Sequence, residues 1–300
     1  MRARHLLAAG GLMVSCMAAI MILSGMHPWE ETEESQGFGL FSWREEVMAD
    51  TEEGALAECI HSAFVTEIYQ YFSEGSFQSG AAASFTQSMA RKGIGVYALV
   101  GEASWAYEED GSSLKEAIRQ VAEFNRQQGK EGQVQGVMVD VEPYLLEEWD
   151  GGREAREALM GSFLKGMENA YGYAAGQQLK FLVCIPTFYD ATNEPVLEEL
   201  IAYACDGVAV MNYNRTDEYG QMAKEVGYAR EFGKEIICIY ELQKAGRHQL
   251  EEINTYAEEG MEALWHSAQR LEKQFGYGGL RFAYHYYEPL KELLGKGLQK

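Results

Sequence analysis

The stretch Gln135-Gly136-Val137-Met138-Val139-Asp140-Val141-Glu142-Pro143 decides the fold of this chain, because its side chains sort into two sets. β-Branched valines at positions 137, 139 and 141 alternate with Gly136, Met138, Asp140 and Glu142. Successive side chains of a β-strand point to opposite faces, so the valines share one face and the two carboxylates share the other. An apolar strand that ends in two acids is typical of a parallel barrel, whose functional sites lie at the C-terminal ends of the strands.

Further apolar runs of this kind recur along the chain and alternate with amphipathic stretches. The strand candidates are residues 37–43, 67–72, 95–101, 136–143, 180–186, 207–214, 235–242 and 279–287. Helical spacing of apolar residues is clear in 113–128, where Leu114, Ile118, Val121 and Phe124 recur every three or four positions. The other helix candidates are residues 80–92, 153–173, 193–204, 219–232, 255–275 and 289–298.

This order of elements predicts the fold class. Strict alternation of strands and helices predicts parallel strands with right-handed crossovers. Eight strands over residues 37–300 predict a single α/β domain of the (β/α)8 TIM-barrel type. An open doubly wound sheet is the alternative, which the absence of a Gly-rich phosphate loop after the first strand disfavours.

The first residues read as a targeting segment. Arg2, Arg4 and His5 precede an uncharged stretch from Leu6 to Met26, and glutamates follow it. A helix needs about 20 apolar residues to span a bilayer. We therefore expect residues 1–26 to be an uncleaved signal anchor, with a cleaved signal peptide as the alternative, and residues 27–36 to be an acidic linker. The charge bias places the barrel outside the cytoplasm, so the protein is expected to be membrane-anchored or secreted.

Composition limits the partners. The formal net charge is −21, from 46 acidic and 25 basic residues, which repels nucleic acid and anionic lipid headgroups. We expect contact with the membrane only through the N-terminal segment, and a monomeric protein. Cys59, Cys184, Cys205 and Cys238 lie in apolar runs or a helix without metal-binding spacing, so buried free thiols are favoured, and a disulfide between neighbouring strands is the alternative.

The paired acids are the strongest candidate for catalysis. Like charges two residues apart on a buried face raise one another's pKa, and a glutamate with a raised pKa suits a general acid. The alternative is that acids at a strand end are solvated or hold a loop. Glu241, at the end of the seventh strand candidate, supplies a second carboxylate across the mouth if Ile237 and Ile239 fill the barrel. Cys238 and Tyr240 could face inward instead, so this parity stays open.

Two strands resemble the family 18 chitinases among the glycoside hydrolase TIM barrels. That family carries DGxDxDxE on strand four and Met-x-Tyr-Asp on strand six, where this chain has residues 135–142 and Met211-Asn212-Tyr213-Asn214. The resemblance implies that Glu142 is the proton donor, that Asp140 orients a substrate acetamido group acting as internal nucleophile, and that Tyr213 hydrogen-bonds that group. Gln135 and Met138 replace the first two acids of the motif, and the loss of the innermost acid, at Met138, disfavours efficient cycling of Asp140.

A second resemblance is to the clan A retaining glycosidases. These enzymes use a glutamate after strand four, often in Asn-Glu-Pro, and a nucleophilic glutamate after strand seven. Val141-Glu142-Pro143 and Glu241 fit that arrangement, although Val141 stands where the asparagine is usual. Two carboxyl groups about 5 Å apart favour a covalent intermediate, and a wider separation of about 6.5–9.5 Å favours water activation.

Aromatic and polar side chains near the predicted strand ends favour a sugar ligand, because flat amphipathic rings stack on pyranose faces. The candidate substrate-binding residues are Trp43, Trp105, Tyr144, Trp149, Tyr189, Asn212, His285 and Tyr287. His285 could also be an ordinary barrel histidine, or a metal ligand with Asp140, Glu142 and Asp190. No paired-histidine spacing supports the metal, so we expect neither metal nor cofactor.

These observations predict a glycoside hydrolase-like protein that acts on an extracytoplasmic polysaccharide, with carboxylate acid/base catalysis by Glu142. The alternative is a carbohydrate-binding barrel that lost its activity, which the incomplete motifs favour. A metal-dependent hydrolase is a third and weaker reading.

Overall fold

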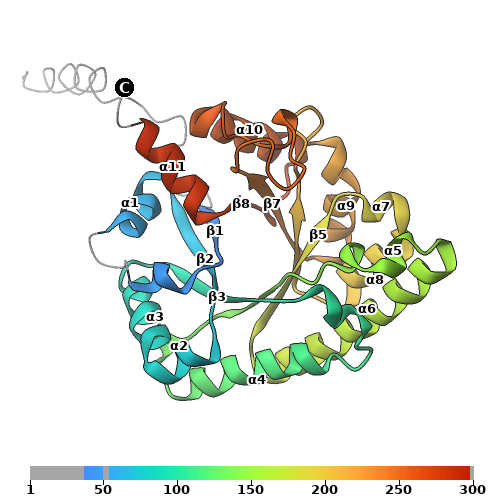
Figure 1. Ribbon diagram of the computed structural model, residues 1–300, viewed down its shortest axis with the longest axis horizontal. Helices are drawn as coiled ribbons and strands as arrows, with labels where there is room; N and C mark the ends of the chain where they lie inside the picture. Colours follow the sequence, from blue (N-terminus) through green and yellow to red (C-terminus); the bar gives the residue numbers. More distant parts are fainter. Residues whose placement is uncertain (1–36, 50–53, 298–300) are drawn as a thin grey trace, which may run out of the picture. The chain divides into compact units, whose positions relative to one another are not determined.

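The computed structural model describes residues 37–49 and 54–297, and they form a closed barrel within the compact unit Gln36–Lys300. Each strand pairs in parallel with the next, and β1 closes the ring by pairing with β8. Helices surround the strands (Figure 1). This confirms the single eight-stranded parallel α/β barrel and excludes the open doubly wound sheet.

All eight predicted strands are present. They are β1 (Phe38–Ser42), β2 (Val65–Tyr71), β3 (Gly95–Val100), β4 (Gly136–Val139), β5 (Lys180–Pro186), β6 (Gly207–Met211), β7 (Glu235–Glu241) and β8 (Leu280–His285). Three of them, β4, β6 and β8, end two or more residues earlier than expected, whereas the other C-terminal ends agree within one residue. Pairing stops at these points because the chain turns into the loops of the mouth; the N–H of Asp140 still donates to the Val100 carbonyl at 2.8 Å, so the extended course continues past β4.

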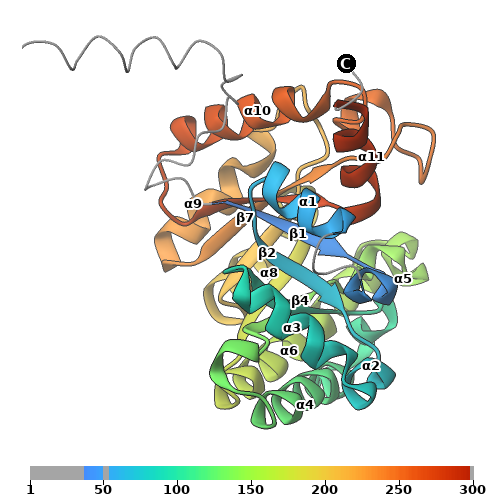
Figure 2. The same ribbon diagram turned by 90° about the vertical axis from the view of Figure 1, so that its left-hand side faces the viewer.

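The predicted helices are also present, with shifted ends. They correspond to α3 (Ala81–Arg91), α4 (Ser112–Arg126), α6 (Arg153–Gly176), α8 (Glu194–Tyr203), α9 (Ala223–Phe232), α10 (Gly260–Phe275) and α11 (Tyr287–Gly297). Between the first two strands lies α1 (Ala55–Ser62), which carries Cys59 and confirms the helix expected around that residue; no bounds were predicted for it, because eight residues give little periodicity to read. Short helices α2 (Glu74–Ser79), α5 (Glu147–Asp150) and α7 (Tyr189–Thr192) add to the ring (Figures 1 and 2).

The barrel interior confirms how the fourth strand sorts its side chains. One buried cluster fills the inside of the barrel: Phe41, Tyr69, Tyr97, Leu99, Met138, Leu182, Cys184, Ala209, Ile237, Ile239 and Ala283. Met138 belongs to it, whereas Val137, Val139 and Val141 are buried outside it. Ile237 and Ile239 also belong to it, which settles the parity of β7 and turns Glu241 inward.

A glycine makes room for the aromatic part of this cluster. A Cβ at Gly39 would lie 2.6 Å from the Tyr69 ring, so only a residue without a side chain fits beside it. Phe41, Tyr69 and Tyr97 then form a chain of rings with centroids 4.8 and 5.7 Å apart. These rings give the functional end of the barrel a rigid floor.

The opposite end of the barrel is closed by an ionic network at the starts of the strands. Arg281 contacts Glu67 at 2.6 Å and Glu235 at 3.4 Å, and Lys180 contacts Glu235 at 2.6 Å. The Tyr69 hydroxyl donates to Glu67 at 3.1 Å. The side chain of Glu67 is only 15% exposed, so it depends on Arg281 for its counter-charge.

We therefore expect Arg281→Met to lower the free energy of unfolding by about 2 kcal/mol, because it leaves Glu67 and Glu235 short of a partner in a partly desolvated site. Urea unfolding measures the change. The matched control is Arg153→Met, which removes an exposed pair with Glu157 on α6 and should change the free energy by less than about 0.5 kcal/mol. Equal effects of the two variants would contradict a structural role for the network.

The predicted signal anchor at 1–26 and acidic linker at 27–36 lie outside the described residues. Among the residues that are described, no helix has both the length and the apolar character needed to cross a bilayer. Cys59, Cys184, Cys205 and Cys238 are all buried, and Cys184, Cys205 and Cys238 are free thiols.

Candidate active site

The end of β4 is held against β3 by a close backbone contact. Gly101 follows β3 with a φ of +147°, and a Cβ there would lie 2.2 Å from the Asp140 carbonyl oxygen. Only glycine adopts this conformation without strain and also allows the approach. Together with the hydrogen bond from Asp140 to Val100, this contact fixes the backbone from which Asp140 and Glu142 project.

Asp140 is a partly buried acid with one unsatisfied oxygen. Its Oδ1 is buried and has no hydrogen-bond partner among the described residues. Burial and the neighbouring charge of Glu142 together raise the pKa of Asp140 to about 7, although His285 and the Cys184 thiol act in the opposite direction. The two acids predicted to share a face therefore do influence each other, and near neutral pH Asp140 is poised between its two forms.

Glu142 accepts a hydrogen bond from a tyrosine that follows it in the chain. The Tyr144 hydroxyl donates to Glu142 Oε1 and lies 3.7 Å from the Met211 sulfur of β6. Burial and the charge of Glu142 raise the pKa of Tyr144, so it remains a hydrogen-bond donor at neutral pH. Tyr144 comes from the 3-10 helix η4 (Pro143–Leu145), directly after the acid that it contacts.

Glu241 lies inward at the end of β7 and is fully engaged by protein groups. Its Oε1 accepts the backbone N–H groups of Leu242 and Gln243 at 2.8 and 2.7 Å, and its Oε2 lies 2.9 Å from His285 Nδ1. The residue is 3% exposed. The pairing of Glu241 with His285 was not foreseen from sequence; adjacent positions at the ends of β7 and β8 were the available signal, because neighbouring parallel strands end side by side.

Tyr213 lies just past β6 and packs against the inner cluster. Burial raises the pKa of its hydroxyl well above the ordinary value, and the charges of Glu241 and Asp140 add to this rise. Its ring centroid is 6.1 Å from that of His285. The Tyr213 hydroxyl is therefore within electrostatic reach of the acids at the ends of both β4 and β7, and it stays protonated at neutral pH.

Several predicted sugar-binding residues do lie at this end of the barrel. Trp43 packs against the inner cluster while partly exposed, and so does Tyr286, which is not one of the candidate residues named above. Trp149, on α5, contacts the rings of Tyr144 and Phe188 with centroids 6.3 and 5.8 Å away, and Arg156 lies over its ring. Trp105 is partly exposed in the 3-10 helix η2 (Ala103–Tyr107) that follows β3.

Three predicted sugar-binding residues have little to offer a ligand. Asn212 is 3% exposed, and its amide donates to the Glu218 carbonyl at 2.9 Å and the Cys238 sulfur at 3.5 Å. It faces away from the barrel interior because Met211 and Tyr213, on either side, face inward. Tyr189 is only 1% exposed, since the rings of Trp149 and Phe188 cover it.

Tyr287 is the third of these residues. It begins α11, is 5% exposed and has the Lys291 ammonium over its ring. Its neighbour Tyr286 contacts the inner cluster in its place, after a cis peptide bond between His285 and Tyr286. Sequence placed both tyrosines at the strand end, but the side that each one faces depends on where β8 stops.

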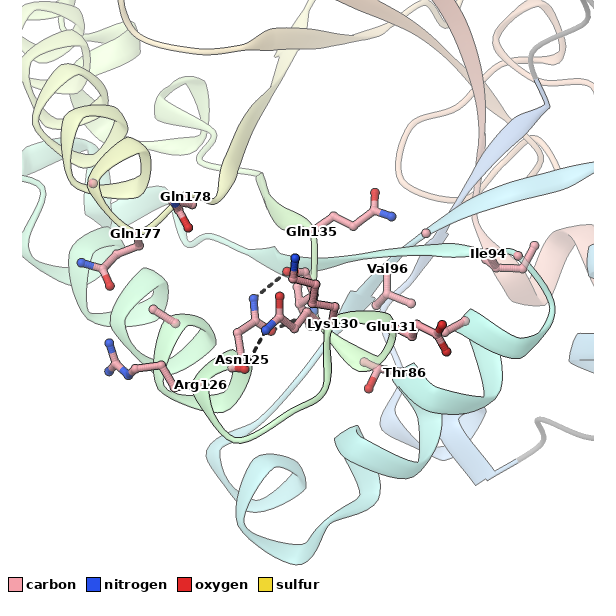
Figure 3. A pocket seen from close by; sticks show the side chains of 17 residues that line it. Thr86, Ile94, Val96, Asn125, Arg126, Lys130, Glu131, Gln135, Gln177 and Gln178 are labelled. Atoms are coloured by element: carbon pink, nitrogen blue, oxygen red, sulfur yellow. Dashed lines mark hydrogen bonds between the residues drawn. The ribbon is translucent and has the colours of Figure 1, made fainter.

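The 780 Å³ cavity lies at the other end of the molecule, at the starts of β3, β4 and β5. Polar side chains line it, including Gln135, Gln177 and Gln178 (Figure 3). Asn125 bonds both the N–H and the carbonyl of Val134 and so braces its wall. None of the candidate catalytic residues lines this cavity. Within the described part of the chain, no group of three or more histidine, cysteine or acidic side chains is placed to hold a metal ion.

Comparison with known proteins supports the architecture. No family model and no curated protein matches this chain. A chitinase from Chromobacterium violaceum ATCC 12472 is similar in structure, with a TM-score of 0.51 and 15% identity over 88% of this chain and 100% of that one. A chitinase from Bacteroides thetaiotaomicron has a TM-score of 0.52 and 13% identity over 87% and 96% of the two chains.

A xylose isomerase domain protein from Planctomyces limnophilus is similar to nearly the same degree, with a TM-score of 0.50 and 12% identity over 87% of this chain and 94% of that one. At these identities the likeness concerns the fold alone. The chain shares the TIM-barrel fold with these proteins, and its reaction must be argued from its own residues.

Proposed function

We propose that this protein is a glycoside hydrolase that cleaves an N-acetylated glycan with the help of the substrate's own acetamido group. The observation that carries the proposal is the placement of Asp140, Glu142 and Tyr213 on the inner side of one barrel end. Asp140 has an unpaired buried oxygen there, Glu142 is held by Tyr144, and the Tyr213 hydroxyl keeps its proton. The similar folds of two chitinases support the proposed hydrolase function by analogy.

In the proposed reaction, Glu142 donates a proton to the glycosidic oxygen as the bond from that oxygen to the anomeric carbon breaks. The acetamido carbonyl oxygen of the same sugar forms a new bond to the anomeric carbon. Asp140, in its ionised form, accepts the acetamido N–H and stabilises the positive charge of the cyclic intermediate, while Tyr213 donates to the acetamido oxygen. Water then attacks the anomeric carbon and gives a proton to Glu142. The bond from the anomeric carbon to the acetamido oxygen breaks in the same step, which restores the acetamido group and releases the sugar.

Substrate assistance fits this site better than a mechanism with two carboxylates. A nucleophilic Glu241 would need a free oxygen, yet both of its oxygens already accept hydrogen bonds within the protein and the residue is nearly inaccessible. Asp140, by contrast, has the unpaired oxygen that an acetamido N–H can satisfy.

The proposed substrate is an extracytoplasmic polysaccharide. The basic residues and apolar stretch at 1–26 argue for export or anchoring of the barrel. Partly exposed aromatic rings at the mouth, such as Trp43, Trp149 and Tyr286, suit stacking on sugar rings. We propose that the protein acts as a monomer.

A non-catalytic carbohydrate-binding barrel is the second candidate, and Met138 favours it. Met138 is completely buried in the inner cluster, directly below Asp140 on the same face. The apolar Met138 side chain cannot form a hydrogen bond with Asp140. Asp140 and Glu142 therefore have less hydrogen-bond support than they would have with a third acid at position 138.

A substrate series tests the proposal. The full-length chain should hydrolyse β-linked N-acetylglucosamine oligomers more than about 100-fold faster than the matching glucosamine or glucose oligomers, because only the first carry the internal nucleophile. Product release measured by chromatography gives the rates. Binding without cleavage of the N-acetylated oligomers would support the non-catalytic barrel, and equal rates on glucose oligomers would contradict substrate assistance.

A further inference from the structure

The carbonyl of Tyr213 is held by a side chain from a different loop. Asn254 Nδ2 donates to this carbonyl at 2.5 Å. Asn254 Oδ1 accepts the backbone N–H of Glu251 at 2.8 Å, so both ends of the amide are engaged and its orientation is fixed. Asn254 is the last residue of the 3-10 helix η6 (Glu252–Asn254), which follows β7. A side chain that follows β7 therefore restrains the backbone that follows β6.

The residue before Tyr213 is restrained from the same direction. The amide of Asn212 lies 3.5 Å from the sulfur of Cys238, which belongs to β7. The same amide donates to the Glu218 carbonyl at 2.9 Å, so the chain after Tyr213 turns back toward Asn212. The main chain on both sides of the Tyr213 Cα is therefore tied to neighbouring protein groups.

Arg215 joins the same two loops. Its backbone N–H donates to the Ile253 carbonyl at 2.9 Å, and its guanidinium donates to the Glu252 carbonyl at 2.7 Å. The guanidinium also pairs with Glu259 at 2.5 Å and lies 5.6 Å from the centroid of the Tyr256 ring. The Arg215 side chain is only 22% exposed, so these contacts are less screened by solvent than those of a surface ion pair.

Glu218 anchors the loop after β6 to α10. The residue is 3% exposed, and its carboxylate accepts hydrogen bonds from the hydroxyls of Tyr256 and Ser267 and from Arg270 at 2.6 Å. A buried carboxylate with three donors is held in one place, because any other position would leave it desolvated and unpaired. Tyr256 also donates its backbone N–H to the Glu241 carbonyl at 3.0 Å, so the loop after β7 is fixed to the end of its own strand.

We propose that segments 212–218 and 251–259 form one rigid clamp that positions Tyr213 to select N-acetylated sugars, with Asn254 as its positioning residue. The inference rests on the proposed function for its purpose, since the clamp matters to the reaction only if the Tyr213 hydroxyl meets the acetamido oxygen. Asn254 acts through the Tyr213 carbonyl in this role and does not bind the sugar. A misplacement of about 1 Å can cost about 10²-fold in rate, so small movements of this backbone are sufficient to change selectivity.

Asn254→Asp tests the clamp in the full-length chain. The aspartate keeps the acceptor for Glu251 but loses the donor and sets a carboxylate against the Tyr213 carbonyl. With 3-fluorotyrosine in place of tyrosine, the 19F NMR signal of Tyr213, identified by its loss in Tyr213→Phe, should shift. Calorimetry should show about tenfold weaker binding of a β-linked N-acetylglucosamine tetramer, which corresponds to one lost hydrogen bond, and binding of a β-linked glucose tetramer within about twofold of wild type.

Arg215→Met tests the same clamp at a second point. It removes the contacts to Glu252 and Glu259 and leaves Asn254 in place. The Tyr213 signal should shift here too, and the N-acetylglucosamine tetramer should bind about threefold more weakly while the affinity for the glucose tetramer is unchanged. If Asn254→Asp does not fold, the result with Arg215→Met decides.

Asn169→Asp is the matched control. Asn169 also donates to a loop carbonyl, that of Glu109 at 2.9 Å, but it lies exposed on α6. Its substitution should leave the Tyr213 signal and both affinities unchanged. If Asn254→Asp lowers the melting temperature but does not move the Tyr213 signal, or weakens the binding of both tetramers equally, Asn254 is merely structural and the inference is overturned.

Hydrolysis separates this inference from the proposed function. If the wild type cleaves no glycan, but Asn254→Asp moves the Tyr213 signal and selectively weakens binding of the N-acetylglucosamine tetramer, the clamp is supported and the hydrolase fails. If the wild type cleaves the tetramer and Asn254→Asp cleaves it with unchanged preference over the glucose tetramer, the hydrolase is supported and the clamp is overturned. A wild-type chain that binds neither tetramer overturns both.

Discussion

Glu142→Gln is expected to lower kcat for hydrolysis of an N-acetylglucosamine oligomer by about 10³-fold while leaving the binding affinity nearly unchanged. The amide keeps the size of the side chain and can still accept a hydrogen bond from Tyr144, but it has no proton to give the leaving oxygen. Steady-state kinetics gives kcat, and calorimetry with the same oligomer gives the dissociation constant.

A nearby acid serves as the control for this change. Glu147 is exposed at the start of α5, and Glu147→Gln alters the charge of the rim by the same amount. Its kcat should remain within about twofold of the wild type, because the charge is screened by solvent. If Glu142→Gln keeps full activity, Glu142 is not the proton donor, and the assignment of the β4 end as the catalytic element fails.

Gly101→Ala is expected to be the most damaging single-methyl change near the mouth, with a loss of about 3 kcal/mol in the free energy of unfolding. The new Cβ would lie 2.2 Å from the Asp140 carbonyl oxygen, and the φ of +147° is strained for alanine. Activity should fall by at least about tenfold as well, because the backbone that carries Asp140 and Glu142 must move. Thermal unfolding and kcat/KM measure the two effects.

Gly172→Ala is the matched control for this prediction. Gly172 lies inside α6, one turn before its C-terminal end, and a Cβ there meets no atom within 4 Å, so alanine should leave activity unchanged and stabilise the helix by about 0.5 kcal/mol. A Gly101→Ala protein that is as stable and as active as Gly172→Ala would show that β3 and β4 are not held together by this contact.

The pH dependence of the enzyme follows from Asp140. Its pKa is raised to about 7 and its ionised form is the one proposed to act, so kcat/KM should fall as the pH drops below about 7. A pH profile in which activity stays level from pH 7 to pH 5 would mean that Asp140 does not need to ionise.

Much of the architecture was predictable because the barrel depends on local patterns. Alternation in residues 135–143 was enough to place Met138, Asp140 and Glu142 on the inner face, since the period of a strand is two residues and depends on no distant contact. The early ends of β4, β6 and β8 share one cause. Where a strand stops depends on its pairing partners and loops, and a single chain segment does not contain that information.

In the candidate site too, the identity of each side chain could be predicted from local sequence, whereas the contacts between side chains could not. Sequence by itself determined which side chains each strand end offers: two acids after β4, a tyrosine after β6, a glutamate on β7 and a histidine on β8. Only the tertiary structure decided which of them meet. Closing the sheet sets β7 beside β8, so that Glu241 binds His285 and not a substrate, and it leaves Asp140 with the free oxygen. Alternation along a strand is a property of the local backbone, whereas contact between strand ends depends on the closure and register of the whole barrel.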